Sequence, residues 1–155
     1  MNIRSFSGHG ESNGENLVVG WDRTPAAQAA LGVAVVLAGK LQAHLHIAHI
    51  ADDSDLGIDP DSPTWEEQTK ALTDETARWL RSQLRGLHTG WTYYSARGSA
   101  AAVLNRVAHE SGSSIVVIGA HRHGVAGLLS RVTRRSLLQD LLDDGLAVLV
   151  VPPAS

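Results

Sequence analysis

The sequence predicts a three-layer α/β protein, with a five-stranded parallel sheet and helices on both faces. Short, continuous apolar runs recur along the chain, as in strands that are buried on both sides. They alternate with segments of helical periodicity, and right-handed connections place such helices on both faces of a parallel sheet. At 155 residues, with 43% hydrophobic and 19% charged residues, the chain is expected to form one domain over residues 16–153. Residues 1–15, which are rich in loop formers, are expected to be a disordered tail.

The first predicted elements are a strand, a helix and a second strand. The apolar run Leu17–Gly20 is typical of a buried strand. Thr24 and Pro25 suit the N-cap and the first position of a helix, whose apolar spacing continues to about Lys40. The alternation of polar and apolar residues from Ala43 to Ile50 predicts the second strand.

The middle of the chain predicts a second helix and a third strand. Apolar residues fall on one helical stripe from Pro63 to near Gly86. Trp65 and Trp79 belong to this stripe and are expected to lie in the core. The aromatic segment 91–96 is typical of a strand.

The last third of the chain predicts two more strand and helix pairs. Ser99 as an N-cap and Gly112 as a stop signal bound the third helix. The apolar run Ile115–Gly119 is the fourth strand. A loop over residues 120–129 leads to the last helix, and Leu146–Val151 forms the fifth strand until two prolines end it.

Composition excludes several classes of function. The chain has no cysteine, which removes disulfides, thiolate zinc sites and cysteine nucleophiles. A net charge of -3 supplies no positive field for a nucleic-acid backbone. No apolar run approaches the roughly 20 residues that span a bilayer, so we expect a soluble, cytoplasmic protein that binds neither nucleic acid nor membrane. No metal site is expected either, because His44 and His46 share a strand face whereas His49 points the opposite way.

Parallel sheets bind ligands beyond the carboxyl ends of their strands, at the point where the strand order reverses. Two segments of this chain follow such strand ends. After the first strand, Asp22 stands between a strand end and a helix N-terminus. Its carboxylate suits hydrogen bonds from a ligand's amine or hydroxyl group, or equally the capping of loop N–H groups. After the fourth strand, the glycines from Gly119 onward and the helix N-terminus near residues 130–133 suit a phosphate, although such glycines also serve as turns.

Together these residues resemble the universal stress protein family over about residues 15–153. The resemblance rests on Gly20 and Asp22 after the first strand, His49–Ile50 at the end of the second, Gly98 in the third strand and helix unit, and Ile115–Gly119. It implies a sheet in the order 3-2-1-4-5, similar to that of adenine-nucleotide hydrolases, and a homodimer formed through the last strand, Leu146–Val151. Some members of this family bind ATP through a Gly-x2-Gly-x9-Gly-Ser/Thr motif after the fourth strand, and others do not.

The phosphate motif is altered in this chain. Gly119 matches its first glycine, but Arg122 stands where the second belongs, and the spacer 123–129 has seven residues rather than nine. Ser130–Arg131 replaces Gly-Ser/Thr, while Val132–Thr133 fits what commonly follows. A positive φ at Arg122 would cost about 1 to 2 kcal/mol, which one charge-assisted hydrogen bond of about 1.5 to 3 kcal/mol would offset. The nucleotide-binding residues implied by the resemblance are Gly20, Asp22, Ile50, Gly119, His121, Arg122, Ser130, Arg131, Val132 and Thr133.

Two functions remain open. The first is a stress-response module that holds ATP or another adenine nucleotide, with or without Mg2+, between the first and fourth strands. It is expected to have no catalytic residues, because no general base or dedicated magnesium ligand for hydrolysis is identifiable. The second is a dimeric module that binds an unidentified protein partner without nucleotide, through its dimer surface and the loop around residues 52–61.

Overall fold

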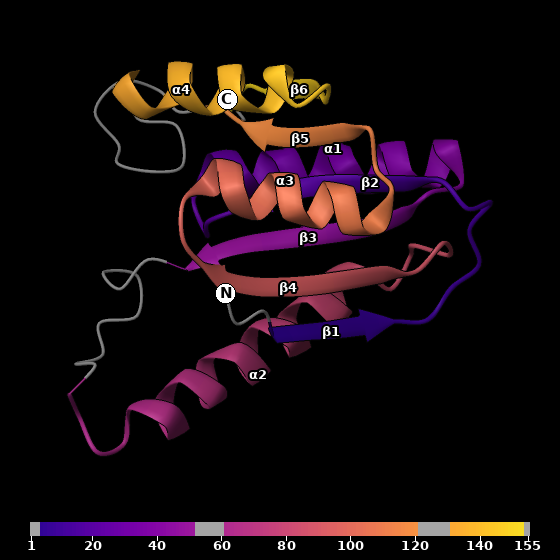
Figure 1. The fold of residues 1–155 in the computed structure, drawn as a ribbon. Coiled ribbons are helices and arrows are strands. Elements are labelled where there is room, and N and C mark those ends of the chain that lie inside the picture. The colour runs from indigo at the N-terminus through magenta and orange to yellow at the C-terminus, as the bar shows by residue number, and fades with distance from the viewer. Residues whose placement is uncertain (1–3, 52–60, 121–130, 154–155) are drawn as a thin grey trace.

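The computed structural model describes residues 4–51, 61–120 and 131–153, with the backbone alone for residues 4, 51 and 131–136. These residues form one six-stranded sheet and four helices (Figure 1). In chain order the elements are β1 (Arg4–Gly8), β2 (Asn16–Trp21), α1 (Pro25–Leu41), β3 (His44–Ala51), α2 (Trp65–Gln83), β4 (Trp91–Arg97), α3 (Ala100–Ser111), β5 (Ile115–Gly119), α4 (Arg131–Asp143) and β6 (Ala147–Val151).

Five strands run parallel in the order β4-β3-β2-β5-β6, which confirms the predicted topology 3-2-1-4-5. The central strand β2 pairs with β3 on one side and with β5 on the other, so that Val19 lies opposite Ile47 and Val117. Leu17, Val18 and Val19 have no exposed surface. A strand covered by helices on both faces must be apolar at successive positions, which is why this run could be found in the sequence.

The prediction of a disordered tail is wrong for residues 4–8, which form the sixth strand. β1 pairs antiparallel with β4 along its whole length. Successive side chains of β1 point to opposite faces of the sheet. Phe6 stacks on Tyr93 with the ring centroids 6.0 Å apart, while Ser5 and Ser7 are exposed. One apolar residue among serines and glycines is too short a pattern to predict a strand. The partner for β1 comes from a distant part of the chain, the open edge of β4.

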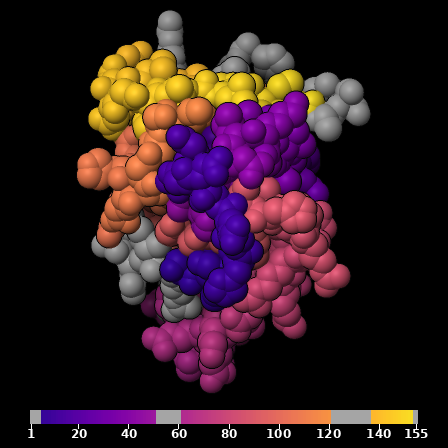
Figure 2. Space-filling model, turned by 90° about the vertical axis from the view of Figure 1, so that its right-hand side faces the viewer, coloured from indigo at the N-terminus to yellow at the C-terminus, as the bar shows by residue number. Residues whose placement is uncertain are grey.

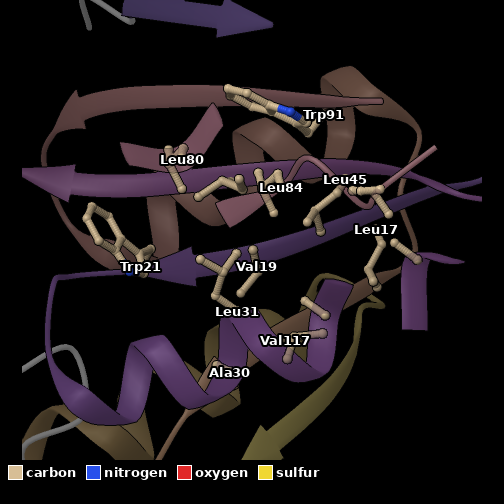
Figure 3. Packing of buried hydrophobic residues seen from close by; sticks show 14 of the residues in the cluster. Leu17, Val19, Trp21, Ala30, Leu31, Leu45, Leu80, Leu84, Trp91 and Val117 are labelled. Atoms are coloured by element: carbon tan, nitrogen blue, oxygen red, sulfur yellow. The ribbon is translucent and has the colours of Figure 1, made fainter. Parts of the chain in front are cut away.

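Helices cover the two faces of the sheet in pairs. On one face, Leu31 of α1 and Leu80 of α2 lie in one apolar cluster with Val19 of β2 (Figure 3). On the other face, Leu104 of α3 and Leu141 of α4 belong to a second cluster. The three-layer prediction is therefore confirmed. Among the described residues, no helix is both long and apolar enough to cross a membrane.

Local sequence signals determine where α1 and α3 begin and end. The Thr24 side chain accepts a hydrogen bond from Ala27 N at 3.2 Å, and Pro25 opens α1, as predicted. Ser99 caps α3 in the same way, and Gly112 ends it with a φ of 70°. This left-handed conformation is accessible to glycine without a steric penalty.

The two tryptophans of α2 differ in environment. Trp79 packs against the core, as expected, and stacks on Trp21 with the ring centroids 5.7 Å apart. Trp65 was expected in the core as well, but it lies outside both apolar clusters, with its ring 4.9 Å from the guanidinium carbon of Arg97. The buried residues of α2 begin only at Thr76, so its first turns contribute little to the core.

The segment between β1 and β2 crosses the amino ends of the parallel strands (Figure 2). Backbone hydrogen bonds hold it there, from Glu11 N to His88 O at 3.0 Å and from Asn13 N to Gln42 O at 2.9 Å. A Cβ at Gly10 would clash with the backbone of residues 88–90. This close approach requires glycine and fixes the segment that leads from β1 into the domain.

Replacing Gly10 with alanine is expected to displace this crossing. The free energy of unfolding should fall by about 1 to 3 kcal/mol, as at other overpacked sites. Gly86→Ala is the matched control, because a Cβ at Gly86 meets no atom within 4 Å and should change stability by less than about 0.5 kcal/mol. Chemical denaturation measures both variants, and equal effects would contradict the role given to Gly10.

Candidate functional site

β2 and β5 end side by side at one edge of the sheet. Val18 pairs with Val116 and Val19 with Val117, so both strands leave the sheet at the same level. The carboxyl ends of the parallel strands face this edge (Figure 1), and the strand order reverses between β2 and β5. Open parallel sheets bind ligands at such a point. The arrangement on which the predicted site depends is therefore present.

Gly20 and Gly119 both lie at this edge, and close packing accounts for both. A Cβ at Gly119 would clash with the carbonyl group of Ala26 in the first turn of α1. A Cβ at Gly20 would lie 3.3 Å from Ile118 Cγ2 and 3.4 Å from Leu104 Cδ2. The two glycines let α1 and α3 approach the strand ends, so their presence does not by itself require a ligand.

Asp22 turns the chain from β2 into α1. Its Oδ1 accepts hydrogen bonds from Thr24 N at 3.1 Å and from Thr24 Oγ1 at 2.5 Å. Because Thr24 Oγ1 also accepts from Ala27 N, the carboxylate braces the N-cap of α1. The capping role that the sequence allowed for Asp22 is thus present. A carboxylate offers about four acceptor positions, so this role is compatible with a bond to a ligand.

Arg23 has a backbone conformation that residues with a side chain rarely adopt. Its φ is 66°, which costs about 1 to 2 kcal/mol for a residue other than glycine. Its Nη2 donates to Thr76 Oγ1 of α2 at 2.8 Å, and its guanidinium carbon lies 5.9 Å from the ring centroid of Trp21. Strained backbone is concentrated at functional sites. Nothing in the sequence singles out this arginine.

An aromatic cluster lies next to the turn after β2. The Trp21 ring meets His49 edge to face at 5.3 Å and stacks on Trp79 (Figure 3 shows Trp21). His49 Nδ1 is 2.8 Å from Tyr93 Oη. His49 Nε2 and Trp21 Nε1 are buried and have no hydrogen-bond partner among the described residues. The members come from β2, β3, β4 and α2, so no local motif could reveal them.

This cluster is uncharged at neutral pH. Burial and, secondarily, the positive charge of Arg23 lower the pKa of His49 to about 4, while Asp22 acts in the opposite direction. Burial raises the pKa of Tyr93 to about 12. A polar atom that is buried without a partner costs about 1 to 3 kcal/mol. The cluster therefore adds unused hydrogen-bonding capacity beside the turn, without adding charge.

Of the remaining predicted residues, Ile50 and the first turn of α4 lie in the part of the chain that the structure describes. Ile50 belongs to β3, is 8% exposed and lies in the apolar cluster beneath α3. His121, Arg122 and Ser130 lie outside the described residues. The first turn of α4 contains Arg131, Val132 and Thr133, and this helix begins on the side of the sheet where the parallel strands end (Figure 1).

His44 and His46 share one face of β3, as predicted, and polar side chains satisfy them. His46 Nε2 is 2.8 Å from Asn16 Oδ1, and its Nδ1 is 2.8 Å from Tyr94 Oη. Because Asn16 Nδ2 donates to a backbone carbonyl, Oδ1 is the acceptor and His46 carries its proton on Nε2. Burial and, secondarily, His44 lower the pKa of His46 to about 4. Within the described ranges, no three histidine or acidic side chains are grouped to hold a metal ion.

The two buried histidines are expected to make the fold sensitive to acid. An unfolded histidine titrates near 6.5, and His46 and His49 titrate near 4, so the unfolded state binds more protons between these values. The free energy of unfolding should therefore fall as the pH is lowered from 6.5 to 4, by up to about 3 kcal/mol for His49. His49→Phe should reduce this slope, because it removes one of the two buried groups that cause it. Urea denaturation at successive pH values tests this, and an unchanged slope in His49→Phe would contradict it.

Comparisons with known proteins agree with this architecture. The model of the universal stress protein family matches residues 14–139. A protein of that family from Burkholderia pseudomallei is similar in structure with a TM-score of 0.55 and 25% identity, over 92% of this chain and 99% of that one. The universal stress protein UspA from Lactobacillus plantarum has a TM-score of 0.61 and 17% identity, over 91% and 99% of the two chains.

A third solved structure shows a universal stress protein in complex with cAMP. It has a TM-score of 0.52 and 17% identity, over 90% of this chain and 98% of that chain. A comparison with curated protein sequences finds no match. The family match extends from the start of β2 into α4 and so includes both strands of the candidate site. The chain therefore belongs to the universal stress protein family.

Proposed function

We propose that this protein is a non-enzymatic, cytoplasmic stress-response module that binds an adenine nucleotide between the ends of β2 and β5. The observation that carries the proposal is the pairing of β2 with β5. This pairing brings the Asp22 turn and the end of β5 at Gly119 to one edge of the sheet. The universal stress protein in complex with cAMP supports an adenine nucleotide as the class of ligand.

The residues at this edge fit such a ligand in part. Asp22 would accept hydrogen bonds from the ribose or the base, and the backbone near Ile50 would contact the adenosine. The N-terminus of α4 would meet the phosphates, because its first backbone N–H groups lack partners within the helix and lie at the positive end of its dipole. Mg2+, when present, would be held mainly by the phosphates, since no protein ligand for it is assigned.

An interaction module without nucleotide is the second candidate function. Arg122 and the shortened spacer 123–129 depart from the motif of ATP-binding members. Gly20 and Gly119, which the chain keeps, already have a role in packing. These observations favour a protein that acts through its dimer surface on an unidentified protein partner.

Thermal unfolding with ATP, ADP, AMP and cAMP separates the two candidates. A nucleotide at a hundred times its Kd should stabilise the protein by about 2.7 kcal/mol, whereas an interaction module should not respond.

Asp22→Ala should weaken nucleotide binding by about tenfold or more, as expected when a charged hydrogen-bond partner is lost. Asp22→Asn keeps an acceptor for Thr24 and controls for damage to the N-cap of α1. Asp74→Ala, at an exposed position in α2, is the control for charge. Equal affinities in the wild type and Asp22→Ala would remove Asp22 from the site.

The dimer that we propose forms through β6, which leaves one edge of the sheet open. Ala147–Val151 is wholly apolar, and Leu149 is 39% exposed. Helix α1 contacts β6 and also exposes apolar side chains, with Val36 at 59%. The opposite edge is β1, in which exposed serines alternate with one phenylalanine. An apolar edge needs a cover, and a second copy across a two-fold axis supplies one.

A charge placed on this edge should separate the protomers. Leu149→Lys is expected to shift the protein from dimer to monomer at micromolar concentration, because the lysine would lose solvent in the paired state. Ser7→Lys places the same charge on the opposite edge and should leave the dimer intact. Light scattering after size-exclusion chromatography measures the mass. A monomeric wild type would contradict the proposed dimer.

A further inference from the structure

A hollow of about 530 Å3 lies at the amino-terminal edge of the sheet, opposite the proposed nucleotide site. It opens between the ends of α3 and α4, and Figure 2 shows these segments, in orange and yellow, next to each other at this edge. Its volume is in the range of about 300 to 1,000 Å3 that is typical of small-molecule sites. The residues around it include Asn105, Ala108, His109, Ser113, Asp144 and Leu146.

Two glycines line this hollow, at the turns that follow α3 and α4. Gly112 and Gly145 follow α3 and α4 with φ values of 70° and 81°. A Cβ at either position would meet no atom within 4 Å. The left-handed backbone favours glycine at both positions, so the turns that end the two helices place no side chain in the space between them.

The polar groups around the hollow favour a positively charged ligand. Asp144 is exposed at the rim, and the last turn of α4 contains no basic residue. The C-terminal ends of α3 and α4, which carry the negative ends of the helix dipoles, converge here. On α3, Arg106 is already paired with Glu110 at 2.9 Å. Of the described residues around the hollow, His109 alone can carry a positive charge.

An unsatisfied acceptor adds to this preference. Asn105 lines the hollow, and its Oδ1 is buried without a hydrogen-bond partner among the described residues. Rotation of the amide about its last side-chain bond exchanges the positions of Oδ1 and Nδ2, so a donor in the hollow can draw the oxygen out of its buried position. The backbone already engages the Ser113 hydroxyl: its one hydrogen is shared between the carbonyl oxygens of Asn16 and Ile115, each 2.9 Å away, and its oxygen accepts from Ile115 N at 3.3 Å. A ligand with N–H donors would therefore find an acceptor that the fold leaves unpaired.

The walls of the hollow are apolar beside these acceptors. Leu146 is partly buried and packs against the apolar cluster beneath α3 and α4, whereas Ala108 lies behind this surface with no exposed area of its own. Such a surface suits an aliphatic stem of a few carbons, while the charged end of the ligand remains near Asp144. We infer that this hollow binds a small protonated alkylamine, with its ammonium group toward Asp144 and Asn105. The inference does not depend on the proposed nucleotide site.

Isothermal titration of the full chain with n-butylamine and 1,4-diaminobutane tests this inference, with neutral n-butanol as the matched ligand. Both amines should bind in a saturable way at constant ionic strength, and n-butanol should not. Asp144→Asn should weaken amine binding by about tenfold or more, because it removes a charge-assisted hydrogen bond. Asp143→Asn makes the same change in net charge at a residue that accepts from Gln139 and does not line the hollow. It should change the affinity by no more than about threefold.

A second variant keeps the inference testable if Asp144→Asn is poorly folded. Asn105→Asp adds a carboxylate at the unsatisfied position and should tighten amine binding. The absence of amine binding at millimolar concentration, equal binding of n-butanol, or equal losses in Asp143→Asn and Asp144→Asn would each overturn the inference. Asp22→Ala should leave amine binding unchanged, which separates failure at this hollow from failure at the nucleotide site.

Discussion

Close contact between the first turn of α1 and the end of β5 organises the carboxyl edge of the sheet. The absence of a side chain at Gly119 lets the carbonyl group of Ala26 come within van der Waals distance of the strand. For α1 to begin there, the chain must turn sharply after β2, and Asp22 holds that turn through Thr24. Asp22, which we propose as a ligand-binding residue, is therefore also part of the packing that forms this edge.

The same turn is connected to α2. Arg23 reaches Thr76, and Trp21 stacks on Trp79, so two contacts join the end of β2 to a helix that is distant in the sequence. The left-handed backbone of Arg23 and the unpartnered nitrogens of Trp21 and His49 lie in this same region. Local strain and unsatisfied polar atoms each oppose folding. Among the described residues, two of the five buried unpartnered polar atoms and one of the two left-handed residues other than glycine lie beside this turn. Their presence together agrees with a region shaped by function as well as by stability.

Most of the fold could be predicted because the parallel strands are buried on both faces. This requires apolar runs such as Leu17–Val19, which are visible without any knowledge of their partners. The start of α1 and both ends of α3 could also be predicted, because the capping residues Thr24, Ser99 and Gly112 act on their neighbours in the sequence. β1 escaped prediction because it is held by pairing with β4 and by a single inward ring.

The candidate site was predicted only where its residues follow strand ends. Asp22 and Gly119 could be placed at one edge because the topology could be predicted. The cluster of Trp21, His49 and Tyr93 could not, because its members meet only when three strands align. The packing roles of Gly20 and Gly119 also depend on how closely helices approach the sheet, which a sequence pattern does not specify.

The position of β1 bears on how the domain is delimited. The family model begins at residue 14 and so leaves this strand outside. A shortened chain cut at that boundary would retain every parallel strand but expose the outer backbone of β4 and the face of Tyr93 that Phe6 covers. Bare strand edges recruit other strands. Such a shortened domain would then aggregate through the edge of β4, which β1 covers in the longer chain. This aggregation would obscure a dimer formed through β6.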